Sequence, residues 1–408
     1  MRIEPSSESL PDESLTGGEN YLAQNACFLR AVPAVYSAPF PHPFRHPLQA
    51  TGWLIRTLFG IVSLILLLAV IAAIPIVNFL ALGYLLEVEG RVARTGRLRD
   101  AFPLLEVAPR IGTILLGVWL WVLPIRFLAS FASDATLIDP GGKSASFLSG
   151  LIFCVSLLIT LHLFLALLRG GGFWCFFRPI KNIRSLITRI NEGNLLLSAE
   201  VQTREFISRL QLKHHFVLGF QGFVGAAIWL FIPTLLLAAA VKQQGGLISI
   251  SVIGGVLLSI VLAWLPFLQT RFAAENRFGA FFELRAIRHA FKQSPLWWMV
   301  AIVFVYLLAL PLYLFKAVAP PRDAMWLVTV VFIMMIYPAK VLLGWVYYRA
   351  TIKKEKRAWW GARWMARIIF IPLLMLYVFV LFFMPAIGEH GRLVLFEHHA
   401  FLLPVPFW

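Results

Sequence analysis

Eight long apolar runs divide the 408-residue chain into loops, and the lysines and arginines concentrate in every second loop. The runs lie near 57–85, 111–131, 147–168, 216–241, 247–270, 296–318, 326–348 and 368–387. A helix needs about 20 apolar residues to cross the hydrocarbon core of a bilayer. Backbone groups in lipid must form hydrogen bonds inside the protein, which helices do by themselves. The sequence therefore predicts an all-α, polytopic membrane protein with about eight transmembrane helices.

The distribution of basic residues predicts the orientation of these helices. The first loop between runs contains five arginines from Arg91 to Arg110, whereas the second loop contains only Lys143. The third, fifth and seventh loops are also basic. Lysine and arginine are retained on the cytoplasmic side of a membrane. We therefore expect the odd-numbered loops to be cytoplasmic, the C-terminus to be outside, and the protein to lie in the plasma (inner) membrane.

The first run is too long for one simple span and too short for two. Pro75 and Asn78 lie inside it, and proline kinks or ends a helix. The pattern allows one long tilted helix or a span followed by an interfacial or re-entrant segment. One crossing would put the N-terminus outside, whereas a re-entrant hairpin would put it inside. Residues 1–51, which are acidic and then rich in proline, have the composition of a disordered tail.

The composition excludes a soluble protein. Of all residues, 60% are hydrophobic and only 14% are charged, whereas soluble domains have about 25% charged residues. The net charge is +16, but it is dispersed among loops that flank the spans. We therefore expect contact with anionic membrane lipids, with a membrane or cytosolic protein as a possible partner, and no nucleic acid.

Three segments of the basic loops have the pattern of helices that lie in the headgroup layer. Apolar residues recur at helical spacing in 180–190 and in 281–291, with basic residues between them, and 359–367 combines tryptophans with arginines. Cationic amphipathic helices of this kind bind membrane surfaces, and docking of a cytosolic protein is the alternative. The basic side chains expected to contact lipid headgroups are Arg91, Arg94, Arg97, Arg184, Arg285, Arg288 and Arg363.

The chain also contains an apparent internal repeat at an offset of 180 residues. Arg91, Ala93, Arg97 and Phe102 align with Arg271, Ala273, Arg277 and Phe282 without a gap. The pattern predicts a tandem four-plus-four repeat, with membrane halves at 52–241 and 242–388 and a C-terminal tail at 389–408. Both halves would have the same orientation. Transporters often place a substrate site between such repeats, although scaffold proteins are duplicated as well.

One segment of the first half carries a family resemblance. The stretches Gly83–Glu87, Arg91–Arg94 and Gly96–Phe102 resemble a group of uncharacterised bacterial multi-pass membrane proteins that carry a domain of unknown function. In that group a Gly-Tyr-Leu segment ends a span and leads into an arginine-rich loop that contains glycine. The resemblance covers roughly residues 52–310. It implies a membrane location and assigns no activity, so it identifies no functional residue.

Three ionisable residues inside the runs are candidates for a functional site. Lys340 lies in the seventh run, His162 in the third and Arg126 in the second. Charged groups at this depth usually face a cavity or a partner. The alternatives are snorkelling for Lys340 and Arg126, and a neutral imidazole hydrogen-bonded to a neighbouring helix for His162. Gln221 and Gln269 are expected to form interhelical hydrogen bonds.

Other chemical signals are missing from the sequence. It contains no phosphate-binding loop, no HExxH motif and no GxSxG motif. The runs contain no acidic residues that could relay protons. The tail residues Glu389, His390, Glu397, His398 and His399 could bind a metal but lack a rigid ligand spacing. We therefore expect no catalytic residue, no cofactor and no metal, although an enzyme acting on lipid is not excluded.

Two functions fit these features. The first is a non-catalytic scaffold or accessory component that binds lipid headgroups or partners through the basic loops. The second is a permease-like carrier with a site between the halves near His162 and Lys340. A carrier needs a water-filled path at this site. In a scaffold the helices should pack tightly, and a carbonyl or carboxylate should cap Lys340.

Overall fold

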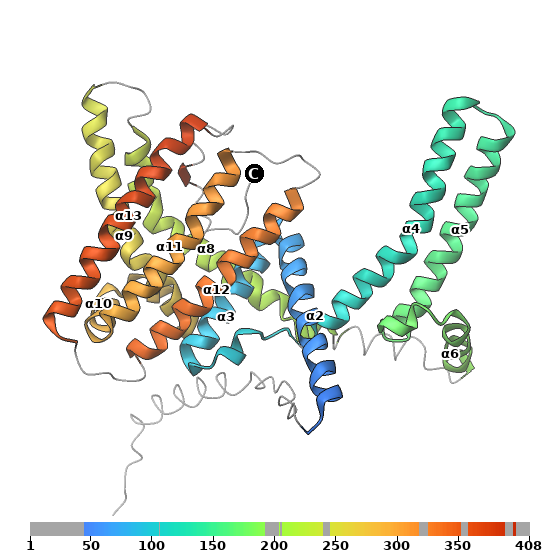
Figure 1. Ribbon diagram of the computed structural model, residues 1–408, viewed down its shortest axis with the longest axis horizontal. Helices are drawn as coiled ribbons and strands as arrows, with labels where there is room; N and C mark the ends of the chain where they lie inside the picture. The colour runs from blue at the N-terminus through green and yellow to red at the C-terminus, as the bar shows by residue number, and fades with distance from the viewer. Residues whose placement is uncertain are drawn as a thin grey trace, which may run out of the picture. The chain divides into compact units, whose positions relative to one another are not determined.

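The computed structural model describes residues 45–105, 107–191, 204, 206–239, 245–317, 325–351, 358–387 and 395–396. These residues form helices and contain no strand (Figure 1). Eight helices are long and apolar enough to cross a membrane. They are α2 (Pro47–Ala72), α4 (Ala108–Ile138), α5 (Lys143–Leu168), α8 (Leu212–Leu237), α9 (Gly245–Glu275), α11 (Pro295–Ala317), α12 (Met325–Thr351) and α13 (Trp360–Ile387). Each overlaps one predicted run, so the all-α polytopic fold is confirmed.

The first run forms two helices instead of one. Helix α2 ends at Ala72, and a separate helix α3 runs from Asn78 to Thr95. The break contains Pro75, which lacks a backbone donor, and Ile76, whose φ of 68° lies in the left-handed region. Thirteen of the 18 residues of α3 are buried. Of the two alternatives, the structure therefore fits a span followed by a second segment, and this second segment is enclosed by protein.

Helix α3 lies at the centre of the bundle, against α2, α8, α9 and α12. Glycines allow three of these contacts: Gly83 meets the backbone of α8, Gly90 meets the backbone of α9, and Gly344 of α12 meets the backbone of α3. A Cβ atom at any of the three would overlap a carbonyl oxygen of the neighbouring helix. Small residues allow helix backbones in membranes to approach this closely. The apolar helices thus enclose a helix that carries four charged residues.

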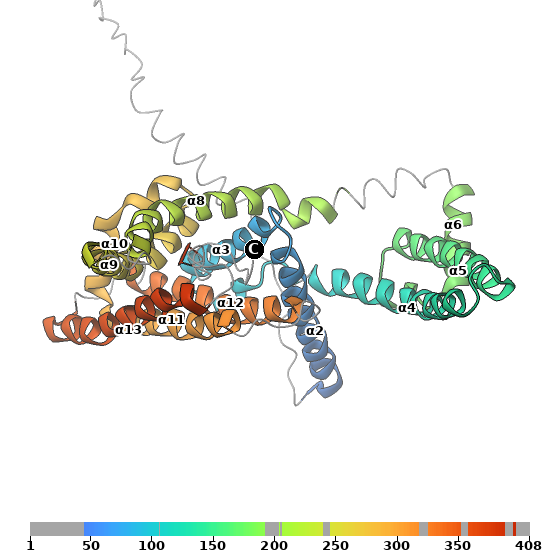
Figure 2. The same cartoon turned by 90° about the horizontal axis from the view of Figure 1, so that it is seen from above.

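Helices α4 and α5 pack mainly on each other, and α4 also packs against α2 (Figures 1 and 2). Only 6% of the apolar window of α4 is buried, compared with 61% for α12. Most side chains of α4 therefore point outward. This distribution fits a helix whose surroundings are lipid.

Local conformations recur at the offset of 180 residues. Gly96 follows the last residue of α3 and has a φ of 67°, and Asn276 follows the last residue of α9 and has a φ of 54°. Arg97 and Arg277 then have extended backbones. The 3-10 turns η1 (Leu98–Ala101) and η4 (Phe278–Phe282) follow. The aligned sequences therefore adopt the same local structure.

The two predicted amphipathic helices have opposite environments. Helix α10 (Leu284–Gln293) buries Ile287, Ala290 and Phe291 inside the protein, against α9, α11 and α12. The prediction that its apolar face lies in lipid is wrong. The apolar side chains of α6 (Pro179–Asn191) are exposed.

Candidate functional site

Lys340 is the centre of a buried polar cluster. Its side chain lies on α12 and is almost wholly inaccessible. The ammonium donates a hydrogen bond to Gln269 Oε1 on α9 at 2.6 Å and lies 3.0 Å from Glu89 Oε2 on α3. Thr270 donates to the other carboxylate oxygen of Glu89 at 2.5 Å. Three helices therefore meet at one ion pair.

Glu89 was not among the residues predicted for this site. The apolar runs lack acidic residues, but Glu89 lies in α3, in a stretch that was assigned to the first loop. Its carboxylate is completely buried because α3 is enclosed by helices that come later in the chain. One signal was present: Glu89 aligns with Gln269 at the repeat offset, and Gln269 was already expected to form an interhelical hydrogen bond.

The cluster lies where α3 meets its repeat counterpart. Glu89 and Gln269 are 180 residues apart, and both contact the Lys340 ammonium. Nearby, Arg94 Nη1 donates to the carbonyl oxygens of Ala273 and Ala274, which are 179 and 180 residues away. The aligned helices α3 and α9 therefore pack against each other through aligned positions.

A second cluster surrounds Glu87, two residues before Glu89 on α3. Arg91 lies 2.7 Å, Arg94 3.3 Å and His214 3.1 Å from its carboxylate oxygens. Burial alone would raise the pKa of Glu87, but the hydrogen bond from His214 and the charges of Arg94 and Arg91 lower it to about 2. Helix α3 is not among the eight candidate spans. The cluster joins α3 to the start of α8 through the hydrogen bond between His214 and Glu87.

The arginines expected at lipid headgroups fall into three groups. Arg91 and Arg94 are partly buried and paired with Glu87, so they contribute to helix packing. Arg363 is intermediate in exposure. The exposed members, which the headgroup prediction still fits, are Arg97, Arg184, Arg285 and Arg288.

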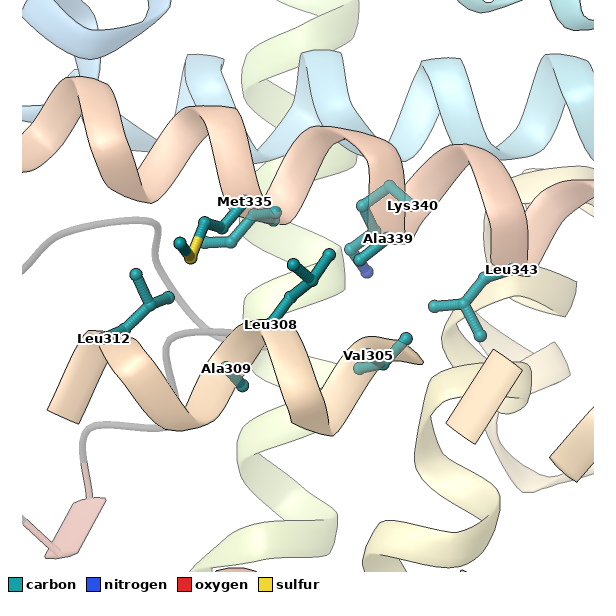
Figure 3. Close-up of a pocket in the computed structure, with 9 residues that line it drawn as sticks. Val305, Leu308, Ala309, Leu312, Met335, Ala339, Lys340 and Leu343 are labelled. Atoms are coloured by element: carbon teal, nitrogen blue, oxygen red, sulfur yellow. The ribbon is translucent and has the colours of Figure 1, made fainter. Parts of the chain in front are cut away.

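An apolar groove lies beside Lys340, between α11 and α12 (Figure 3). The groove is small, and its lining consists of Val305, Leu308, Ala309, Leu312, Met335, Ile336, Ala339, Lys340 and Leu343. Lys340 is the single polar side chain of that lining. The groove therefore offers almost no groups that could orient a polar solute.

His162 belongs to a different part of the fold. Its Nε2 lies 2.8 Å from the carbonyl oxygen of Phe176, which also accepts a hydrogen bond from Trp121 Nε1 at 2.9 Å. Because a carbonyl oxygen can only accept, Nε2 carries the proton. Helix α5 packs mainly on α4 and α6, so the structure does not bring His162 and Lys340 together. Arg126 is exposed on α4, as snorkelling requires.

Within the described residues, no group of His, Cys, Asp and Glu side chains could hold a metal ion. The cluster at Glu389, His390, Glu397, His398 and His399 lies outside these residues. The acidic and proline-rich tail before residue 45 lies outside them as well.

Comparisons of the chain with protein-family models, with curated proteins and with solved structures found no match.

Proposed function

We propose that this protein is a non-catalytic scaffold or accessory component of the membrane, which binds lipid headgroups or partner proteins through its basic loops. The observation that carries the proposal is the environment of Lys340. A carboxylate and an amide oxygen cap its ammonium inside a closely packed bundle. A transport site must exchange its ligands with water, whereas this ion pair is shielded from it.

The location and the repeat are part of the same proposal. We place the protein in the plasma membrane with its odd-numbered loops in the cytoplasm, because those loops carry the basic residues. We also propose a tandem repeat, which the matching conformations around Gly96 and Asn276 support. The resemblance to the uncharacterised bacterial membrane proteins agrees with this view and adds no activity.

The test of the proposal is whether water reaches the groove beside Lys340. Replacing Lys340 itself would leave Glu89 buried without its cation and disturb the bundle. Single cysteines therefore replace Ala309 and Ala339, which line the groove together with Lys340, in a chain without the native Cys27, Cys154 and Cys175. The protein is reconstituted in vesicles and treated with a membrane-impermeant thiol reagent from each side.

We expect both groove cysteines to stay unlabelled from either side. Cysteines at Gly141 and Arg99 are matched controls, because they lie in loops at opposite ends of α4. Labelling of the groove positions at a rate near that of the loop controls would refute the scaffold proposal. It would favour the permease-like alternative at Lys340, without His162.

A further inference from the structure

The segment that follows α5 is fixed to the end of that helix. Gly170 and Gly171 have φ values of 120° and 65°, which turn the chain sharply after Arg169. Arg169 Nη1 donates to Asn182 Oδ1 at 3.1 Å, and Asn182 Nδ2 donates to the carbonyl of Cys175 at 2.7 Å. Asn182 is buried and belongs to α6. Helix α6 is therefore held against the end of an apolar span (Figure 1).

Phe176 provides the second attachment of this segment. Its side chain is wholly buried, and its ring packs against Gly117 of α4, where a Cβ atom would lie 2.6 Å from the ring. Trp121 and His162 bind its carbonyl oxygen. The segment thus has little freedom to move away from the level at which α4 begins and α5 ends.

A ridge of isoleucines on α6 faces outward. Ile180 is 81%, Ile183 50%, Ile187 53% and Ile190 57% exposed. On a helical wheel they lie within one face, whereas Lys181, Arg184 and Thr188 lie on the adjacent face. Trp174 and Phe177, just before the helix, are also exposed, and the Arg178 guanidinium lies 5.7 Å from the Trp174 ring. The surface combines apolar, aromatic and cationic groups.

This combination favours a lipid surface as the occupant. The attachment to α5 places α6 at the end of a span, which is the depth of the headgroups. Tryptophan prefers that depth, and a helix with one apolar and one cationic face binds anionic membranes. We propose that α6 lies flat in the headgroup layer, inserts its isoleucine ridge among the lipid chains and binds anionic phospholipid through Lys181 and Arg184. This inference rests on the proposed function and names its lipid contact.

Helix α10 shows what the same sequence pattern looks like when protein covers it. Its Ile287 and Phe291 are no more than 2% exposed, because α9, α11 and α12 enclose them. The corresponding residues of α6 have no such cover within the described part of the chain. The lipid inference therefore applies to α6 and not to α10.

The experiment measures the depth of two positions on α6. Single cysteines at Ile183 and Thr188, in the full chain without native cysteines, carry a nitroxide spin label. The protein is reconstituted in phosphatidylcholine vesicles with and without phosphatidylglycerol. Collision with oxygen reports exposure to lipid, and collision with a water-soluble nickel chelate reports exposure to water. The variant Lys181→Gln/Arg184→Gln is measured with the label at Ile183.

We expect the Ile183 label to collide with oxygen and to be sheltered from nickel, and the Thr188 label to collide with nickel. Phosphatidylglycerol should shelter the Ile183 label further, and the charge variant should abolish this change. Three results would overturn the inference. The first is that nickel reaches the Ile183 label as readily as the Thr188 label, and the second is that the Ile183 label is sheltered from both reagents, as it would be under a protein partner. The third is that phosphatidylglycerol shelters the Ile183 label in the charge variant as much as in the unchanged helix. Each could occur while the groove cysteines remain unlabelled, so the two proposals fail independently.

Discussion

At the scale of single residues, the dominant feature is a lysine and a glutamate buried together. Neither charge would be stable alone at this depth. Their separation is 3.0 Å, and Gln269 and Thr270 supply further hydrogen bonds. Removing one partner of a buried pair costs about 3–5 kcal/mol, whereas replacing both with uncharged groups of similar volume is often neutral.

This asymmetry gives a prediction for Glu89 and Lys340. Glu89→Gln and Lys340→Met should each lower the Tm of the protein in nanodiscs, because each leaves one buried charge unpaired. The double variant should recover most of the loss. Lys143→Met, at an exposed lysine at the start of α5, is the control and should leave the Tm unchanged. A double variant with a Tm below both single variants would contradict this account.

Glu87 gives a prediction about pH. Its pKa is lowered from 4.5 to about 2 in the folded protein, so its ionised form stabilises the fold. This stabilisation, roughly 3 kcal/mol at 1.4 kcal/mol per pKa unit, is complete above pH 4.5 and is lost as the pH falls toward 2. Glu87→Gln should therefore have a lower Tm than the wild type at neutral pH, and the difference should shrink in acid. A constant difference over that range would refute the assignment.

At the scale of helices, the sequence predicts what depends on length and hydropathy alone. The eight spans meet that condition. Helix α3 does not, because its burial depends on parts of the chain that come much later. Gly83 meets His215, Gly90 meets Ala273 and Glu89 meets Gly344, and the partners in each pair are more than 120 residues apart. For the same reason, the sequence patterns of α6 and α10 do not distinguish an exposed helix from a covered one. Whether Ile183 or Ile287 is covered depends on the tertiary fold.

The candidate site was predicted in part. Lys340 was identified because a charge within an apolar run is conspicuous, and Gln269 was expected to bond between helices. Glu89 was missed because it lies beyond the end of the run, among three other charged residues, Glu87, Arg91 and Arg94. His162 was paired with Lys340 from its similar depth in the repeat, but α5 does not occupy the place in the first half that α12 occupies in the second.

Close packing of α3 on α8 gives a prediction for two glycines. A Cβ on Gly83 would overlap the carbonyl oxygen of His215, whereas a Cβ on Gly150, in the middle of α5, would meet nothing within 4 Å. Gly83→Ala should therefore force α3 and α8 apart and lower the Tm in nanodiscs. Gly150→Ala should leave it unchanged or raise it slightly, since alanine favours helix. Equal Tm values for the two variants would mean that α3 and α8 are not this close.

At the scale of the whole molecule, the break at Pro75 bears on the side of the membrane from which α2 starts. Gly60 of α2 faces Pro109 of α4, and Ser63 of α2 faces Gly112. Because these contacts advance in the same direction along both helices, α2 and α4 run parallel. Both must then start on the same side of the membrane. Since α4 starts directly after the basic first loop, we infer that α2 also starts on the cytoplasmic side.

Thiol labelling from either side can check this orientation. A cysteine at Leu48, which is 87% exposed, should react from the same side of sealed vesicles as one at Arg99. A cysteine at Gly141, between α4 and α5, should react from the opposite side. Reaction of Leu48 and Gly141 from the same side would instead support a single crossing of the first run.

The central position of α3 also constrains the order of biogenesis. Ribosomes deliver the chain from its N-terminus, so Glu89 leaves the ribosome 251 residues before Lys340, the cation that lies against it. Until α12 has been made, α3 carries a carboxylate that lipid disfavours. The ion pair at the centre of the bundle can therefore form only after α12 has been made.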